Sequence, residues 1–232
     1  MLKAQRYMVK STLNYTCTNC HTTHKKWAGK CESCGEWNSI KEEAPLASGP
    51  KGKTLGVNKG RKIILGDLTT VDAPLKRSTL GINEFDRVLG GGLVPASAIL
   101  VSGDPGIGKS TLLLQAAADF ARTGKKVIYI SGEEASSQIR MRAQRLNLTD
   151  ASVKLASETN LRDILTTLEE EKPDLAIIDS IQTMWADHVD SSPGSVSQVR
   201  ATAHELTTFA KRKGVAIMLV GHVTKEGQIA GP

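Results

Sequence analysis

The amino-acid sequence predicts an α/β fold with a mostly parallel central sheet, preceded by a small module built around four cysteines. Three observations support this prediction. Four cysteines fall close together near the N-terminus, short apolar runs alternate with amphipathic stretches from about residue 63, and a glycine-rich loop follows one of those runs. The length of 232 residues suits one medium-sized domain with one small module. We therefore expect a module at residues 1–40, a linker at 41–62 and an α/β core at 63–232.

Composition excludes several classes of protein. Hydrophobic residues make up 40% of the chain and charged residues 23%, as in globular proteins, and aromatic residues only 4%. No apolar run approaches the roughly 20 residues that span a bilayer, so we expect no membrane partner. The N-terminus has basic residues but no apolar stretch after them, which is unlike a secretory signal. These features predict an intracellular, cytoplasmic protein.

The net charge of +6 is unevenly distributed. Residues 1–62 contain 12 Lys and Arg against four Asp and Glu, whereas the other 170 residues are slightly acidic. A solvated basic arm explains this pattern, and so does contact with nucleic acid or another polyanion. Charge alone does not separate the two explanations.

The cysteines form two C-x2-C pairs that are ten residues apart. They are Cys17, Cys20, Cys31 and Cys34. Two such pairs supply a tetrahedral shell of four thiolates, which favours zinc and leaves no open position for catalysis. Two disulfides or a redox pair are the alternatives. Disulfides fit an intracellular chain less well, and a redox motif needs one C-x2-C pair rather than two with this spacing. His21 and His24 are nearby alternative ligands. We predict a structural zinc finger whose metal supplies much of its folding energy.

Residues 41–62 differ in composition from the segments on either side. They combine two prolines and four glycines with five lysines and an arginine, and they show little apolar periodicity. This composition predicts a basic linker.

The predicted core alternates strands with helices. We expect strands at 98–102, 126–130, 175–179 and 215–220, and helices at 111–122, 138–146, 160–171 and 196–213. Alternation of this kind is typical of a parallel sheet that is covered on both faces.

The glycine-rich loop has the pattern G-x4-G-K-S. Its residues are Gly103, Asp104, Pro105, Gly106, Ile107, Gly108, Lys109 and Ser110. Backbone N–H groups of such a loop, with the positive end of the next helix, bind the phosphates of a nucleotide such as ATP. Lys109 reaches the outer phosphates, the Ser110 hydroxyl ligates magnesium, and Thr111 adds a phosphate contact. A chance glycine-rich turn is a poor alternative between an apolar strand and an amphipathic helix.

A second magnesium carboxylate is expected at the end of a buried strand, and Asp179 ends the apolar run 175–179. Ser180 follows it, so the carboxylate that activates water must come from elsewhere. Glu133 and Glu134 follow the strand 126–130, and we suppose that this strand neighbours the loop strand and opens onto the same crevice. Either glutamate can orient or deprotonate the attacking water. Both can instead be charges that favour the next helix dipole.

His222 stands at the end of the last predicted strand. A polar residue there faces the γ-phosphate, so His222 is a candidate catalytic residue that senses the nucleotide state. A histidine without a specific role is the alternative.

A larger set of residues resembles a known family. The stretch Gly81–Pro95 is similar to the lead-in of RecA/KaiC-type ATPases. Together with the phosphate loop, residues 131–134, residues 221–231 and a four-cysteine finger containing Trp27 and Trp37, it resembles the bacterial RadA (Sms) family. The resemblance runs from about Cys17 to Pro232. His21 and Ala96 stand where glycine is usual in the family.

The resemblance implies a RecA-like P-loop ATPase core in a DNA-dependent ATPase of recombinational DNA repair. Such a protein forms a homo-oligomeric ring, expected to be a hexamer, binds single-stranded and branched DNA, and drives branch migration. A recombinase or a replicative helicase is a possible partner, and ATP, magnesium and zinc are the expected cofactors. Family members continue into a Lon-protease-like domain, so we expect this chain to be a shortened form.

The resemblance also places DNA in the ring channel, held by loops. The candidate segments are 186–197 and 224–230, and Lys225 is the basic residue of the second. An equally good explanation is that Lys225 is only solvated and contacts no DNA. The predicted helix 138–146 carries three arginines, Arg140, Arg142 and Arg145. They either contact nucleotide or a neighbouring subunit, or they form an exposed basic face. The rival functions are a KaiC-like nucleotide switch or scaffold, which the finger disfavours, and a small-molecule kinase, whose lid is not evident.

Overall fold

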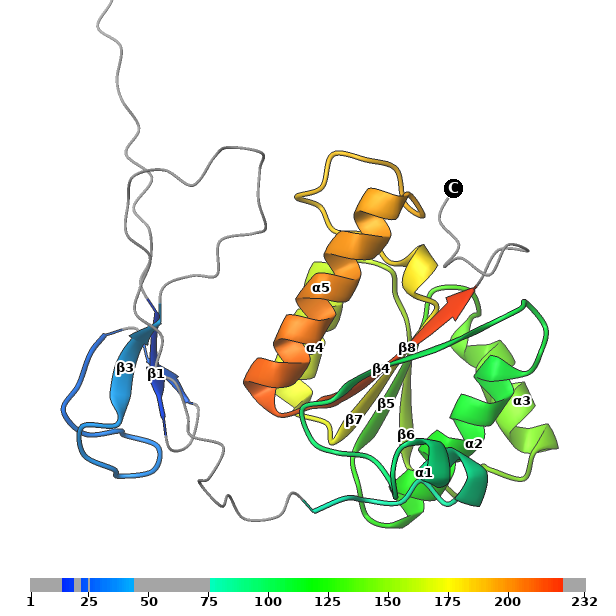
Figure 1. The fold of residues 1–232 in the computed structure, drawn as a ribbon, viewed down its shortest axis with the longest axis horizontal. Helices are drawn as coiled ribbons and strands as arrows, with labels where there is room; N and C mark the ends of the chain where they lie inside the picture. The colour runs from blue at the N-terminus through cyan, green and yellow to red at the C-terminus, as the bar shows by residue number, and fades with distance from the viewer. Residues whose placement is uncertain (1–13, 19–21, 25, 44–75, 223–232) are drawn as a thin grey trace, which may run out of the picture. The chain divides into compact units, whose positions relative to one another are not determined.

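The computed structural model describes residues 14–18, 22–24, 26–43 and 76–222 (Figure 1). The chain divides into two units, Met1–Val71 and Asp72–Pro232. Nearly all of the predicted linker 41–62 lies outside the described residues, so its boundaries stay a prediction. Each unit is described by itself.

The described part of the first unit contains a small antiparallel sheet with the strand order β2-β1-β3. Its strands are β1 (Asn14–Cys17), β2 (Thr23–His24) and β3 (Ile40–Glu43). The buried apolar cluster consists of Cys17, Cys31 and Ile40, with Tyr15 and Ala28 packed against it. A cluster of this size is too small to stabilise a fold by hydrophobic burial alone, so the unit needs a further source of stability.

The second unit is built on a five-stranded sheet in which every neighbouring pair is parallel. The strand order is β4-β8-β7-β5-β6. The strands are β4 (Ala98–Gly103), β5 (Val127–Ser131), β6 (Val153–Ser157), β7 (Leu175–Asp179) and β8 (Ala216–His222). All carboxyl ends therefore lie at one edge of the sheet, where ligands of open parallel sheets bind.

Helices cover both faces of this sheet (Figure 1). One face carries α2 (Lys109–Arg122) and α3 (Ser136–Arg145), with the short α1 (Asn83–Val88) beside them, and the other carries α4 (Leu161–Glu171) and α5 (Val196–Lys213). Alternate side chains of each strand enter the two cores: Tyr129 and Ile177 belong to the α2 side, and Ile128 and Ile178 to the α4–α5 side. This two-core arrangement explains why β5 and β7 read as continuous apolar runs.

Local signals fix the ends of the α4 and α5 helices. Asn160 caps α4 by accepting a hydrogen bond of 2.9 Å from the backbone N–H of Arg162, and Pro173 follows its end. The Ser195 hydroxyl caps α5, and Gly214 ends that helix in the left-handed conformation.

The predicted fold class is confirmed, because a mostly parallel sheet with helices follows an N-terminal cysteine cluster. In the described part of the second unit, three elements were not predicted: α1, β6 and the 3-10 turn η1 (Ile181–Thr183). One supposition is wrong: β5 does not neighbour the loop strand β4, because β8 and β7 lie between them. Among the described residues, no helix has the length and apolar character needed to cross a membrane.

Candidate nucleotide site and metal centre

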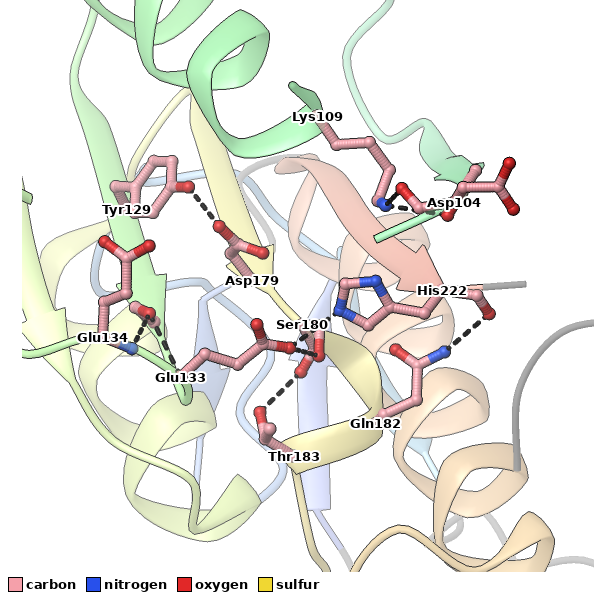
Figure 2. Close-up of polar contacts among 12 residues, drawn as sticks. Asp104, Lys109, Tyr129, Glu133, Glu134, Asp179, Ser180, Gln182, Thr183 and His222 are labelled. Carbon is pink, nitrogen blue, oxygen red and sulfur yellow. Dashed lines mark hydrogen bonds and ion pairs between the residues drawn. The ribbon is translucent and has the colours of Figure 1, made fainter. Parts of the chain in front are cut away.

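The glycine-rich loop connects β4 to α2 at the carboxyl edge of the sheet. Gly106 and Gly108 have φ of 79° and 102°, and a Cβ atom at either would meet nothing within 4 Å. The backbone conformation, rather than lack of space, therefore requires glycine at these positions. The buried Lys109 ammonium donates hydrogen bonds of 2.8 and 2.7 Å to the carbonyl oxygens of Gly103 and Asp104 (Figure 2). The lysine charge is thus held inside the loop.

Asp179 ends β7 and is only 5% exposed. Its Oδ2 accepts a 2.5 Å hydrogen bond from the Tyr129 hydroxyl, and its Oδ1 is buried with no hydrogen-bond partner among the described residues. A buried carboxylate oxygen without a partner is costly unless a ligand completes it. Magnesium prefers oxygen ligands, so Asp179 and the Ser110 hydroxyl at the start of α2 fit a magnesium ion bound with nucleotide.

The two candidate glutamates point in different directions (Figure 2). Glu133 Oε1 accepts a 2.5 Å hydrogen bond from the Ser180 hydroxyl and lies 2.9 Å from His222 Nε2. Glu134 instead forms an ion pair with Arg142 of α3. Glu133 is therefore the glutamate that contacts the residue after β7 and the last residue of β8, although β5 is not next to the loop strand.

Several groups act on the Glu133 carboxyl at once. Burial raises its pKa, but hydrogen bonds from Ser180 and then His222, with the charges of His222 and Lys109, outweigh burial and hold the pKa below its ordinary value. The influence of Lys109 shows that the loop lysine and this carboxylate share one electrostatic environment. A carboxylate with a lowered pKa is ionised at neutral pH and can accept a hydrogen bond or a proton from water.

The backbone that presents Glu133 is tightly constrained. The Ser131 hydroxyl accepts hydrogen bonds from the backbone N–H groups of Glu133 and Glu134, at 3.2 and 2.9 Å. A Cβ atom on Gly132 would lie 2.0 Å from Thr183 Oγ1, so only glycine fits there without a shift of the Thr183 side chain. Sequence reasoning did not identify Gly132, Ser180 or Tyr129 as parts of the site. In the sequence, the glycine of the S-G-E-E stretch was the one indication that the backbone before Glu133 is constrained.

His222 is the last residue of β8 and lies opposite Gly103 of β4 in the sheet register. Its Nδ1 is buried without a hydrogen-bond partner among the described residues. The Gln182 side chain donates a 3.2 Å hydrogen bond to the His222 carbonyl oxygen. His222 therefore connects the loop strand, Glu133 and the η1 turn.

The sulfur atoms of Cys17, Cys31 and Cys34 all lie within 4.8 Å of one another. The distance from Cys17 Sγ to Cys34 Sγ is 3.7 Å. Zinc–sulfur bonds of about 2.3 Å give a tetrahedral edge of about 3.8 Å, so this spacing fits a shared metal ion. The predicted fourth ligand, Cys20, lies outside the described residues. His24 Nε2 is 3.4 Å from Cys31 Sγ, beside a ligand sulfur.

Two segments, 186–197 and 224–230, were predicted to contact DNA. Lys225 and the segment 224–230 lie outside the described residues. The segment 186–197 contains Asp187 and Asp190 but no lysine or arginine, and Arg162 pairs with Asp187. Its start is held by the buried Gln198, whose side-chain nitrogen donates to the carbonyl oxygens at 186, 189 and 191. These charges do not favour a phosphate contact by this segment.

The three arginines of α3 do not act alike. Arg142 is partly buried and pairs with Glu134, whereas Arg140 and Arg145 are exposed. Of these three arginines, only Arg142 therefore contacts a residue that adjoins the candidate site, Glu134.

The fold and the crevice define a class, the P-loop nucleotide-binding proteins with a parallel sheet, here combined with a cysteine-rich metal module. Family models agree with both parts. Residues 81–228 match the model described as an AAA domain, and residues 15–42 match the model described as a rubredoxin metal binding domain. Because the first match covers more than half of the residues, the chain belongs to the AAA domain family.

Several curated relatives are named DNA repair protein RadA. The chain is 51% identical to the DNA repair protein RadA of Brucella abortus, 46% identical to that of Aquifex aeolicus and 47% identical to that of Escherichia coli. These matches cover 97%, 97% and 94% of this chain but only 50%, 49% and 48% of the relatives. The chain thus spans about half the length of the curated relatives it matches. The resemblance to RadA found in the sequence is confirmed.

Proposed function

We propose that the chain carries the metal module and ATPase core of a DNA-dependent ATPase that acts in recombinational DNA repair. It would bind single-stranded DNA and drive branch migration of recombination intermediates. The observation that carries the ATPase part is the position of Glu133, which is held by Ser180 and His222 and lies near enough to Lys109 for the lysine charge to lower its pKa. Similarity to proteins named for DNA repair supports the biological role.

The proposed hydrolysis assigns a role to each group. Residues 103–111 bind the phosphates through backbone N–H groups, the Lys109 ammonium and the Thr111 hydroxyl. Magnesium, held by Ser110 and Asp179, would neutralise charge on the outer phosphates. Glu133 orients the attacking water and accepts its proton as the oxygen attacks the γ-phosphorus, giving ADP and phosphate. Glu134, paired with Arg142, supports the backbone of this segment.

His222 provides a route from the nucleotide to the next segment. Its ring contacts Glu133, and its backbone begins the stretch that contains Lys225. A change at the γ-phosphate that moves Glu133 would therefore change the His222 contact. We propose that this contact couples the nucleotide state to DNA held by Lys225 in the channel of a homo-oligomeric ring, a hexamer by family resemblance.

The remaining parts of the proposal concern the metal module, its partners and the location of the protein. Zinc bound by Cys17, Cys20, Cys31 and Cys34 would give the first unit the stability that its small core lacks. Its surface would contact DNA, a neighbouring subunit, or a recombinase or replicative helicase. The cytoplasm is the proposed location.

The test is binding to a fluorescent single-stranded oligonucleotide, followed by anisotropy at two salt concentrations. Each titration is run with ADP and with a non-hydrolysable ATP analogue. We expect binding that is tighter in one nucleotide state and weaker at high salt, because lysine–phosphate contacts release counterions.

A matched pair of variants separates a specific contact from net charge. Lys225→Ala should reduce affinity and lower the salt dependence, whereas Lys211→Ala, on the exposed side of α5, removes the same charge and should not. Equal effects of the two variants would contradict the role of Lys225. Absence of DNA binding in both nucleotide states, in this chain and in a full-length version, would favour the nucleotide-switch or scaffold function.

A further inference from the structure

We propose that Tyr129 is a positioning residue for the magnesium carboxylate: its hydroxyl holds one oxygen of Asp179 and so leaves the other oxygen to bind the metal. The inference rests on the proposed function, because it concerns the metal that accompanies the nucleotide. It assigns a role to a residue of β5 that the phosphate-loop pattern does not include.

The contact is direct and fully buried. Tyr129 is 0% exposed and belongs to the apolar core between the sheet and α2. Its hydroxyl donates the 2.5 Å hydrogen bond to Asp179 Oδ2, across the parallel pair β5–β7 (Figure 2). Asp179 Oδ1 is buried and has no partner among the described residues. The two oxygens of one carboxylate therefore differ, since one is held by the protein and the other is available.

Packing alone does not explain a tyrosine at this position. Its cluster is otherwise apolar, and phenylalanine would fill the same space without burying a hydroxyl group. A buried hydroxyl is costly without a partner, and here Asp179 is that partner. Removing the hydroxyl would leave both oxygens of Asp179 without a protein donor and free to rotate. The carboxylate would then be poorly oriented for the metal.

The experiment measures the affinity of a fluorescent non-hydrolysable ATP analogue with excess Mg²⁺ and with EDTA. The variants are Tyr129→Phe, the packing control Ile128→Val on the opposite face of the same strand, Asp179→Asn, and the double variant of Tyr129→Phe with Asp179→Asn. For each protein, the ratio of the two affinities reports the contribution of magnesium. Because the ratio is taken within one protein, a general loss of stability cancels.

We expect Tyr129→Phe to bind the analogue normally in EDTA and to lose about tenfold of the Mg²⁺-dependent gain in affinity. Ile128→Val should keep the wild-type ratio, and Tyr129→Phe should add nothing in the Asp179→Asn background. A wild-type ratio in Tyr129→Phe, or an equal loss in the Asp179→Asn background, would overturn the inference while leaving the proposed function intact. A wild-type protein without any Mg²⁺-dependent gain would overturn both.

Discussion

The substitution Gly132→Ala tests how the backbone positions the proposed catalytic glutamate. Gly132 comes directly before Glu133, and a Cβ atom there would lie 2.0 Å from Thr183 Oγ1 and 2.8 Å from Thr183 Cβ. Both distances are shorter than real Cβ atoms tolerate. Because Thr183 is β-branched, a simple rotation does not relieve the second contact.

The expected cost follows from these contacts. Moving Thr183 breaks its 2.8 Å hydrogen bond to the Ser180 carbonyl oxygen, which contributes about 1 kcal/mol to the free energy of unfolding. Overpacking adds about 1–3 kcal/mol. Replacing glycine by alanine also restricts the unfolded chain and returns about 0.4–1 kcal/mol. The net loss is about 1–3.6 kcal/mol, or roughly 2–14 °C in Tm for a domain of this size.

Activity should fall further than stability implies. Ser180 contacts Glu133, so a shift of the 180–183 turn misplaces the carboxylate that orients water. We expect nucleotide affinity near the wild-type value and hydrolysis reduced by about 100-fold, since small displacements of reacting groups are costly. Thermal unfolding and single-turnover hydrolysis measure the two effects.

A second substitution makes this prediction falsifiable. Thr183→Ala removes the atom at 2.0 Å, so the double variant with Gly132→Ala should lose less stability than the sum of the two single losses. A Gly132→Ala protein with wild-type Tm and hydrolysis would refute the reasoning. Strict additivity in the double variant would refute the proposed collision with Thr183.

Three further predictions concern other groups of the structure. Lys109→Ala should lower ATP affinity about 10- to 100-fold in a binding titration, because a charged donor to the phosphates is removed, and an unchanged affinity would contradict its assignment. Ser180→Ala removes a hydrogen bond that lowers the pKa of Glu133, so the pKa of this carboxyl should rise. The acid limb of the hydrolysis pH profile should then move to higher pH, because Glu133 must be ionised to act as the base. An acid limb that does not move would count against Glu133 as the base. Cys31→Ser should bring the metal content measured by mass spectrometry below one ion per chain and make residues 14–43 sensitive to protease, whereas full occupancy in this variant would exclude Cys31 as a ligand.

Local patterns explain why much of the fold was predictable. The phosphate loop, the strand that ends in Asp179 and the paired cysteines each depend on residues close together in the sequence. The alternation of strands and helices also indicated a parallel sheet. Elements with weak signals were missed, since α1 has only six residues and β6 is an edge strand in which a lysine interrupts the apolar residues and no residue is fully buried.

Other features depend on contacts between distant residues. The choice between Glu133 and Glu134 requires side-chain directions, and the roles of Ser180 and Tyr129 require knowing that β5 pairs with β7. The order of strands was not evident from the chain, so the predicted adjacency of β5 and β4 was wrong. Similarly, nothing in the sequence of the segment 186–197 shows that Gln198 holds it.

The most direct test of the proposed mechanism compares single-turnover ATP hydrolysis in Glu133→Gln and Glu134→Gln, with ATP binding measured on the same preparations. Both substitutions remove one charge from neighbouring positions, but only Glu133 contacts Ser180 and His222. We predict that Glu133→Gln binds ATP and hydrolyses it about 10²–10⁴-fold more slowly, whereas Glu134→Gln stays within about tenfold of wild type. Hydrolysis retained in Glu133→Gln and lost in Glu134→Gln would contradict the assignment.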